Sequence, residues 1–194
     1  MGPSLLLAAF PPELAGLDAT PPSGWRVATT GVGAVVAAAA TARLVAELRP
    51  SRVIFVGTCG AYDARLAVLD LLAARAAIAT SLDELEGRAY RPSLEAVRFE
   101  ATWTVPGLAP HDVAVPPAIT RTAEGAARLA AVAPAEHLEL TGVFAACRGA
   151  GVPVAAALAV ANKVGPVAHE EWRANHGRAS RALLEALAPV LGAP

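Results

Sequence analysis

The sequence has few of the residues that mark several large classes of protein. Only two cysteines, Cys59 and Cys147, occur among 194 residues, which excludes a disulfide-rich scaffold and predicts two reduced thiols rather than one disulfide. Lys163 is the only lysine, and aromatic residues make up 5% of the chain. The formal net charge is -1, so we expect no basic surface for nucleic acid or for an anionic membrane.

No apolar run is long enough to cross a membrane or to act as a secretory signal. The run over residues 5–10 follows no basic segment and ends at Pro11 and Pro12. Arg43 interrupts the run over 35–46, and the run over 152–161 is about ten residues long. We therefore expect a cytoplasmic protein with no membrane partner.

What the sequence does have is an alternation of apolar runs with helical patterns. Hydrophobic residues make up 55% of the chain and charged residues 17%, which is typical of a folded domain with a buried sheet. We expect a single domain over 1–194, of the α/β class, with helices on both faces of the sheet. The expected strands are 4–9, 25–29, 52–56, 118–122, 152–160 and one or two within 66–79, and the expected helices are 34–48, 138–149 and 170–191.

Several common functional motifs are missing. Gly31-Val32-Gly33 opens a helix, but Val36 stands where the dinucleotide fingerprint needs a third small residue, and no acidic residue follows at the required distance. The sequence has no CxxC, no HExxH and no paired histidines, so we expect no metal. It also has no Gly-x-Ser-x-Gly, and Cys59 is interpreted as a small packing residue rather than a nucleophile.

Three polar residues stand at the ends of apolar segments. Ligands of α/β sheets bind at the carboxyl ends of strands, which would bring residues 10–13, 57–60 and 162–164 to one edge. Glu13 follows the first expected strand, Glu139 lies at a helix start and Asn162 ends an apolar strand. Each also has a purely structural interpretation: a solvated loop residue, a carboxylate favoured by a helix dipole, and a turn former.

Four segments, taken together, resemble the nucleoside phosphorylase and nucleosidase superfamily, in the branch of methylthioadenosine nucleosidases and futalosine hydrolases. They are LLLAAFPPEL over 5–14, the Gly-Val-Gly helix with the following strand and small-residue loop VIFVGTCGA within 30–61, the Glu139 helix with its Gly-Val-Pro strand within 136–160, and VANKV over 160–164. The resemblance covers about half of the chain in the family's order. It implies a three-layer αβα fold with a mixed central sheet, a homodimer, a small-molecule nucleoside as partner and no cofactor.

The same resemblance implies roles for individual residues. Glu13 is the expected general base for an attacking water, and Asn162 is expected to hold the departing base. Glu139 would accept hydrogen bonds from the ribose hydroxyls. The remaining expected substrate contacts are Phe10, Thr58, Cys59, Gly60 and Leu138.

The residues favour hydrolysis of a purine nucleoside over phosphorolysis. A phosphorylase must bind a phosphate dianion, whereas the segment 8–13 has no cation, two prolines and a carboxylate. Phosphorolysis remains an alternative, because the sequence does not exclude that Arg26, Arg43, Arg65 or Arg121 reaches the site and binds phosphate. A catalytically degenerate, nucleoside-binding protein is a further alternative. An amide such as Asn162 both donates and accepts hydrogen bonds, so it is able to meet a 6-oxo group. The resemblance to futalosine hydrolases and to phosphorylases of hypoxanthine and guanine, which have Asn there, implies a 6-oxopurine base.

Overall fold

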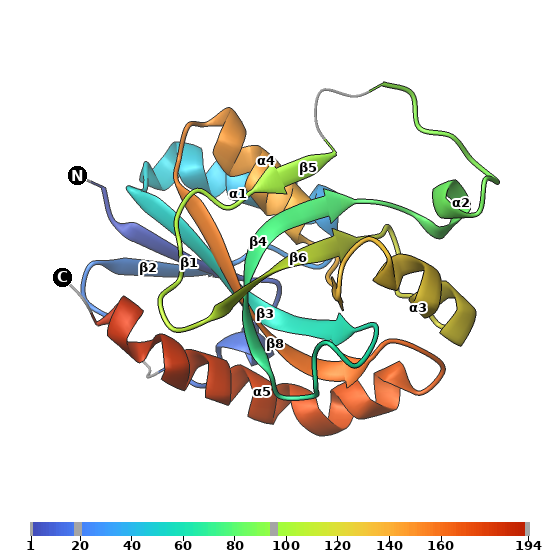
Figure 1. Ribbon diagram of the computed structural model, residues 1–194. Helices are drawn as coiled ribbons and strands as arrows, with labels where there is room; N and C mark the ends of the chain where they lie inside the picture. Colours follow the sequence, from blue (N-terminus) through green and yellow to red (C-terminus); the bar gives the residue numbers. More distant parts are fainter. Residues whose placement is uncertain (1, 18–20, 94–96, 193–194) are drawn as a thin grey trace.

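The computed structural model describes residues 2–17, 21–93 and 97–192 and shows a strongly twisted sheet covered by helices (Figure 1). Its strands are β1 Ser4–Ala8, β2 Trp25–Thr29, β3 Arg52–Ala61, β4 Leu71–Ala79, β5 Arg98–Glu100, β6 Ala109–Val115, β7 Ala135–Glu136 and β8 Val154–Lys163. Its helices are the 3-10 turn η1 Pro11–Leu14, α1 Ala34–Leu48, α2 Leu82–Leu85, α3 Ala123–Ala130, α4 Leu140–Gly149 and α5 Ala168–Leu191.

The sheet is mixed and closes on itself. Strands β2, β1, β3 and β8 run parallel in that order, and β4 then pairs antiparallel with β8. Beyond β4, the parallel partner β6 leads to β7, which pairs antiparallel with β3. The five strands β3, β8, β4, β6 and β7 therefore form a closed ring, with β5 added antiparallel to β4. The prediction of a mixed central sheet is confirmed.

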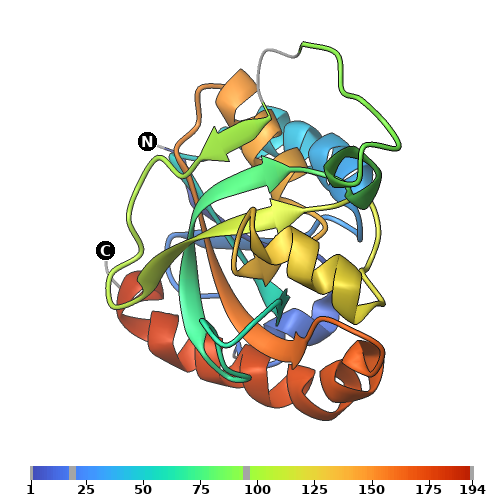
Figure 2. The same cartoon turned by 45° about the vertical axis from the view of Figure 1, so that its right-hand side comes forward.

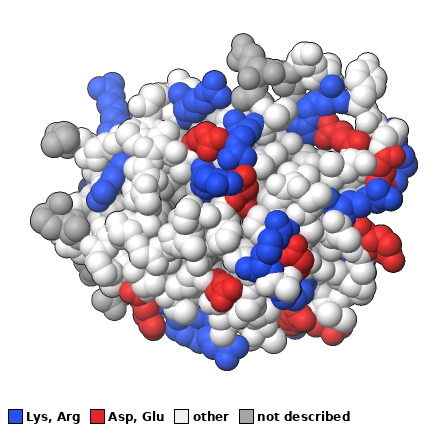
Figure 3. Space-filling model, in the orientation of Figure 1, with Lys and Arg blue, Asp and Glu red and all other residues white. Residues whose placement is uncertain are grey.

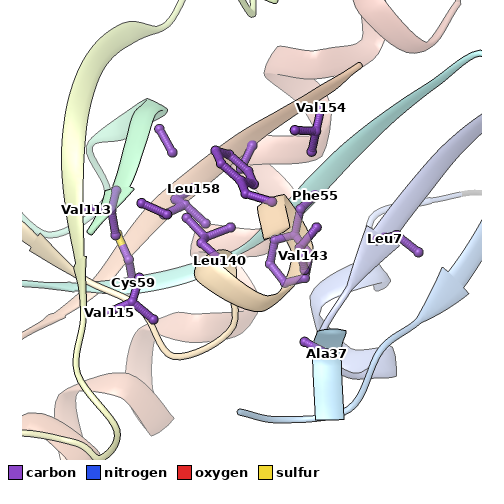
Figure 4. Packing of buried hydrophobic residues seen from close by; sticks show 14 of the residues in the cluster. Leu7, Ala37, Phe55, Cys59, Val113, Val115, Leu140, Val143, Val154 and Leu158 are labelled. Carbon is purple, nitrogen blue, oxygen red and sulfur yellow. The ribbon is translucent and has the colours of Figure 1, made fainter. Parts of the chain in front are cut away.

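Helices cover both faces of the sheet, as predicted. Helices α1 and α4 pack on one face, where buried residues of the two helices meet side chains of β1, β3 and β8 (Figures 1 and 4). Helix α5 covers the opposite face through Leu183, Leu184 and Leu187 (Figure 2). Helix α3 closes a third, smaller cluster that includes Tyr62 and Val164. This arrangement is the three-layer order expected from the sequence.

Small residues allow these layers to approach closely. Strand β8 carries five alanines among its ten residues, and they are all buried. Where α4 crosses α1, a Cβ at Gly142 would overlap the carbonyl oxygen of Ala34. Glycine at this position is therefore required for the two helices to touch, and their contact brings the start of α1 next to the start of α4.

Some expected elements are wrong. Residues 118–122 form no strand, because Pro116 and Pro117 end β6 before them and the segment continues as a loop into α3. The strand of this region is β6. It was not predicted, because Pro110, His111 and Asp112 interrupt its apolar pattern. Strand β3 continues through residues 57–61, where the resemblance predicted a small-residue loop, and residues 66–79 hold one strand.

Charged side chains on the surface form local ion pairs with one another. Asp112 accepts hydrogen bonds from Arg75 Nε at 2.8 Å and from both terminal nitrogens of Arg98 at 2.8 and 2.9 Å. Acidic and basic side chains lie beside one another across the face in Figure 3. None of the helices described here combines the length and the apolar character needed to cross a membrane.

Candidate active site

A cavity of about 300 Å³ lies where β1, β3 and β8 end. All eight residues predicted from the sequence line it: Phe10, Glu13, Thr58, Cys59, Gly60, Leu138, Glu139 and Asn162. The expectation that the segments 10–13, 57–60 and 162–164 share one edge follows from the parallel pairing of these three strands. Their chemical roles stay predictions.

Glu13 is buried at the inner wall of this cavity. The two prolines begin a 3-10 turn directly after β1, and this turn points Glu13 inward with 3% of its surface exposed. Its Oε1 accepts hydrogen bonds from Thr58 N at 2.8 Å and from Thr58 Oγ1 at 3.0 Å, and its Oε2 accepts one from Ala9 N at 3.1 Å. Burial raises the pKa of Glu13 to about 7, although the hydrogen bonds from Thr58 and Ala9 oppose the rise.

Helix α5 supports this carboxyl from the far side. Trp172 Nε1 donates a hydrogen bond to Thr58 Oγ1 at 3.1 Å, so the Thr58 hydroxyl is free to donate to Glu13. The Trp172 ring stacks between His169 and His176, at centroid distances of 5.9 and 4.4 Å. Phe10 lies 6.0 Å from the same ring. Phe10, His169 and Trp172 therefore form an aromatic wall of the cavity.

Glu139 joins the starts of two helices. It is the N-cap residue of α4, and its Oε1 accepts a hydrogen bond from Gly33 N, the N-cap residue of α1, at 2.7 Å. Gly33 has a φ of 94°, which a residue with a side chain rarely adopts. The other oxygen, Oε2, lies 3.1 Å from His137 Nδ1. Burial lowers the pKa of His137, and the Glu139 carboxylate opposes that change.

Asn162 lies beside a glycine in the floor of the cavity. The pairing of β3 with β8 shifts by one residue after Cys59, which places Gly60 opposite Asn162. Asn162 Nδ2 donates to the carbonyl oxygen of Lys163 at 2.9 Å and faces Gly60, where an added Cβ would lie 3.1 Å from it. The ammonium group of Lys163 is directed elsewhere, to the carbonyl oxygens of Asp63 and Leu66.

No lysine or arginine is among the described residues that line the cavity. Arg43 pairs with Glu47, and Arg65 with Asp63. Cys59 is a free cysteine, and burial raises the pKa of its thiol, which agrees with a packing role. Across the described part of the chain, no three His, Cys, Asp or Glu side chains form a group able to hold a metal ion.

Sequence reasoning missed several residues of the cavity. Trp172 lies inside the predicted helix over 170–191 and His169 directly before it, and neither was assigned to the cavity, although their spacing of three marks one helix face. Glu136 and His137 lie in or next to β7, a strand too short to show a period. Ile119 comes from the loop mistaken for a strand.

A second, larger hollow of about 630 Å³ lies on the other side of Leu138. It is lined by the start of α1 and by the segments 79–92 and 115–117. Its charged side chains, Glu84 and Arg91, pair with each other. The geometry thus favours the smaller cavity as the reactive site.

Comparisons with known proteins agree with this architecture. Residues 25–137 match the family described as the phosphorylase superfamily. A futalosine hydrolase mutant from Helicobacter pylori superposes with a TM-score of 0.82 at 17% identity, covering 96% of this chain and 97% of that chain. A methylthioadenosine/S-adenosylhomocysteine nucleosidase from Neisseria meningitidis, solved with methylthio-immucillin-A, gives 0.81 at 16% identity, covering 99% of both chains.

No curated protein matches the sequence significantly. At such low identities the solved structures establish the fold alone. The family rests on the sequence match, which spans more than half of the chain. The chain belongs to the phosphorylase superfamily.

Proposed function

We propose that the protein hydrolyses the N-glycosidic bond of a purine nucleoside with a 6-oxopurine base, in the manner of a futalosine hydrolase. One observation carries this proposal. Glu13 is a buried carboxyl whose pKa is raised to about 7, and it lines a cavity to which the described residues contribute no lysine or arginine. A group that titrates near neutral pH is suited to accept a proton from water. Without a cation, the cavity is poorly suited to hold a phosphate dianion.

Cleavage of the bond builds positive charge on the sugar and negative charge on the base. Water attacks the anomeric carbon while Glu13 accepts its proton, and the bond from that carbon to the base nitrogen breaks. The base departs with the bonding electrons and is stabilised by a hydrogen bond from Asn162. Glu139 orients the ribose, because its carboxylate has acceptor capacity beyond the bond from Gly33.

The walls of the cavity suit a flat, weakly polar ligand. Gly60 and Thr58 allow close approach to the backbone of β3, and Cys59 is a small neighbour in that floor. Phe10, Trp172 and Leu138 supply aromatic and aliphatic lining to the same cavity.

The test is release of free base from inosine, adenosine, methylthioadenosine and futalosine, each with and without phosphate. We expect phosphate-independent release, fastest from the 6-oxopurine nucleosides. Release that requires phosphate would identify a phosphorylase and remove Glu13 as base. Binding of a nucleoside without release from any of the four would identify a binding protein.

The homodimer implied by the sequence resemblance is part of the proposal. Val32, Val35, Val36 and Ile119 are each more than half exposed, and Val32 and Ile119 also line the cavity. Light scattering should give the mass of two chains, and Val35→Glu should give the mass of one, because a charge would then be buried on association. A wild-type protein that is monomeric at micromolar concentration would contradict this part.

A further inference from the structure

A second buried carboxylate, which the proposed reaction does not use, lines the same cavity. Glu136 lies in β7 and has 6% of its surface exposed. Its Oε2 accepts hydrogen bonds from Thr120 Oγ1 at 2.6 Å and from Tyr62 OH at 2.9 Å. Its Oε1 accepts only from Thr120 N, at 3.3 Å, among the described contacts. Three donors thus converge on a group that acts as an acceptor, and Oε1 retains acceptor capacity.

The strand register places this carboxylate beside Asn162. Gly60 of β3 pairs with Glu136 of β7 on one side and with Asn162 of β8 on the other. Directly paired residues project from the same face of a sheet. Glycine at position 60 lets Asn162 lie close against the floor, because a Cβ there would meet Asn162 Nδ2 at 3.1 Å and Val164 Cγ2 at 2.7 Å. An amide and a carboxylate therefore lie on either side of Gly60, and all three residues line the cavity.

This pair matches one kind of purine edge. A 6-oxopurine carries a hydrogen on ring nitrogen N1, next to the oxygen at C6, whereas adenine has a bare acceptor nitrogen at N1 and an amine at C6. A carboxylate accepts a hydrogen bond from N1–H of the 6-oxopurine, whereas it repels the lone pair on N1 of adenine. An amide N–H donates to the oxygen at C6 or to N7 of the 6-oxopurine.

We propose that Glu136 is a specificity-determining residue that accepts a hydrogen bond from N1–H of a 6-oxopurine, beside Asn162. The inference rests on the proposed function, since it assigns the base-contacting end of the same cavity. Tyr62 and Thr120 then act as positioning residues, because they hold the carboxylate through its other lone pairs. The backbone N–H of Thr120 also bonds to this carboxylate, which holds the neighbouring cavity residue Ile119 in place.

The first test changes the ligand and leaves the protein intact. Methylation at N1 removes the hydrogen and puts a methyl group against the carboxylate. We expect the wild-type enzyme to bind hypoxanthine at least about tenfold more tightly than 1-methylhypoxanthine or adenine, measured by titration calorimetry, since a hydrogen bond to a charged group is lost. Equal affinity for hypoxanthine and 1-methylhypoxanthine would overturn the inference.

The second test compares two variants of the same hydrogen-bonded cluster. Glu136→Gln keeps the shape and removes the charge, whereas Tyr62→Phe removes one bond to the carboxylate and keeps the charge. We expect Glu136→Gln to lower the ratio of kcat/KM for inosine to that for adenosine at least about tenfold. We expect Tyr62→Phe to lower this ratio by a smaller factor than Glu136→Gln does, and the exposed Glu170→Gln of α5, outside the cavity, to leave it within about twofold. If Glu136 has only a structural role, Glu136→Gln would lower kcat/KM for both substrates by the same factor. The ratio would then stay unchanged, which would contradict the proposal.

The two tests separate failure of the inference from failure of the proposed function. Selective binding of hypoxanthine without base release would uphold Glu136 and overturn hydrolysis. Phosphate-independent release with an unchanged ratio in Glu136→Gln would uphold hydrolysis and overturn Glu136. If Glu136→Gln does not fold, the wild-type comparison of hypoxanthine with 1-methylhypoxanthine decides.

Discussion

Glu13 combines burial with three hydrogen bonds, and its replacement tests the reaction directly. Glu13→Gln preserves the side-chain shape and an oxygen for Thr58 N–H, but it does not accept the proton of water. We expect kcat for base release to fall by about 10²- to 10⁴-fold while nucleoside affinity stays within a few-fold. The exposed Glu170→Gln, in α5, is the matched control. An unchanged kcat in Glu13→Gln would remove Glu13 from the mechanism.

Asn162 gives a second prediction for a single residue. Asn162→Asp replaces the amide donor with a carboxylate, which accepts from the amine of a 6-aminopurine or carries a proton to N7. We expect the preference to move toward adenosine, measured as the ratio of kcat/KM for inosine to that for adenosine. A ratio that does not move would show that Asn162 does not read the base.

Eight cavity residues were predictable from the sequence because each lies at or near the end of an apolar run or at a helix start. Glu13 and Asn162 follow such runs, and parallel pairing alone brings their strands to one edge. Trp172 and Glu136 were missed for physical reasons. The first enters the cavity through the packing angle of a long helix, and the second through a two-residue strand fixed by its partners rather than by its own sequence.

Among the elements, the contact between α1 and α4 gives the sharpest stability prediction. Gly142→Ala puts a methyl group into the carbonyl oxygen of Ala34, and a backbone atom of a packed helix has little room to move. We expect a loss of about 1–3 kcal/mol in the free energy of unfolding, measured by urea denaturation. Activity should fall as well, because the displaced helices separate Gly33 from Glu139.

The control for Gly142→Ala lies on the same helix. Gly149 has no atom within 4 Å of an added Cβ, so Gly149→Ala should leave the protein equally or more stable. Equal stability of the two variants would show that the helices do not depend on the close approach at Gly142.

The elements differ in how far the sequence predicts them. The ranges of β2 and α1 were predicted to the residue, because alternating or helical apolar patterns are bounded there by glycine or proline. Strands β5, β6 and β7 were missed. Their polar residues are paired within the sheet region, as Asp112 is with Arg75 and Arg98, so polarity does not mark them as loop.

At the scale of the whole molecule, the pairing of β1 with β3 explains how a carboxyl is held in a buried position beside the cavity. The described pairing of β1 with β3 ends at Phe55, and beyond it the amides of Thr58 in β3 and of Ala9 after β1 donate to Glu13. The sequence alone does not reveal these hydrogen bonds, because the donors come from two segments that only the folded sheet brings together. They stabilise Glu13 only in part, because desolvation remains the largest influence on its pKa.

That imbalance predicts how folding stability depends on pH. In the folded protein Glu13 stays protonated up to about pH 7, whereas its ordinary pKa is 4.5, so between these values the folded state binds more protons than the unfolded chain. Stability contributed by Glu13 is therefore fully present below pH 4.5 and is lost as the pH rises through 7. From pH 4.5 to pH 8, the wild type should lose up to about 3 kcal/mol more than Glu13→Gln, measured by urea denaturation without ligand. Parallel pH dependences would show that Glu13 ionises normally, and the raised pKa that fits it to accept a proton from water would then be absent too.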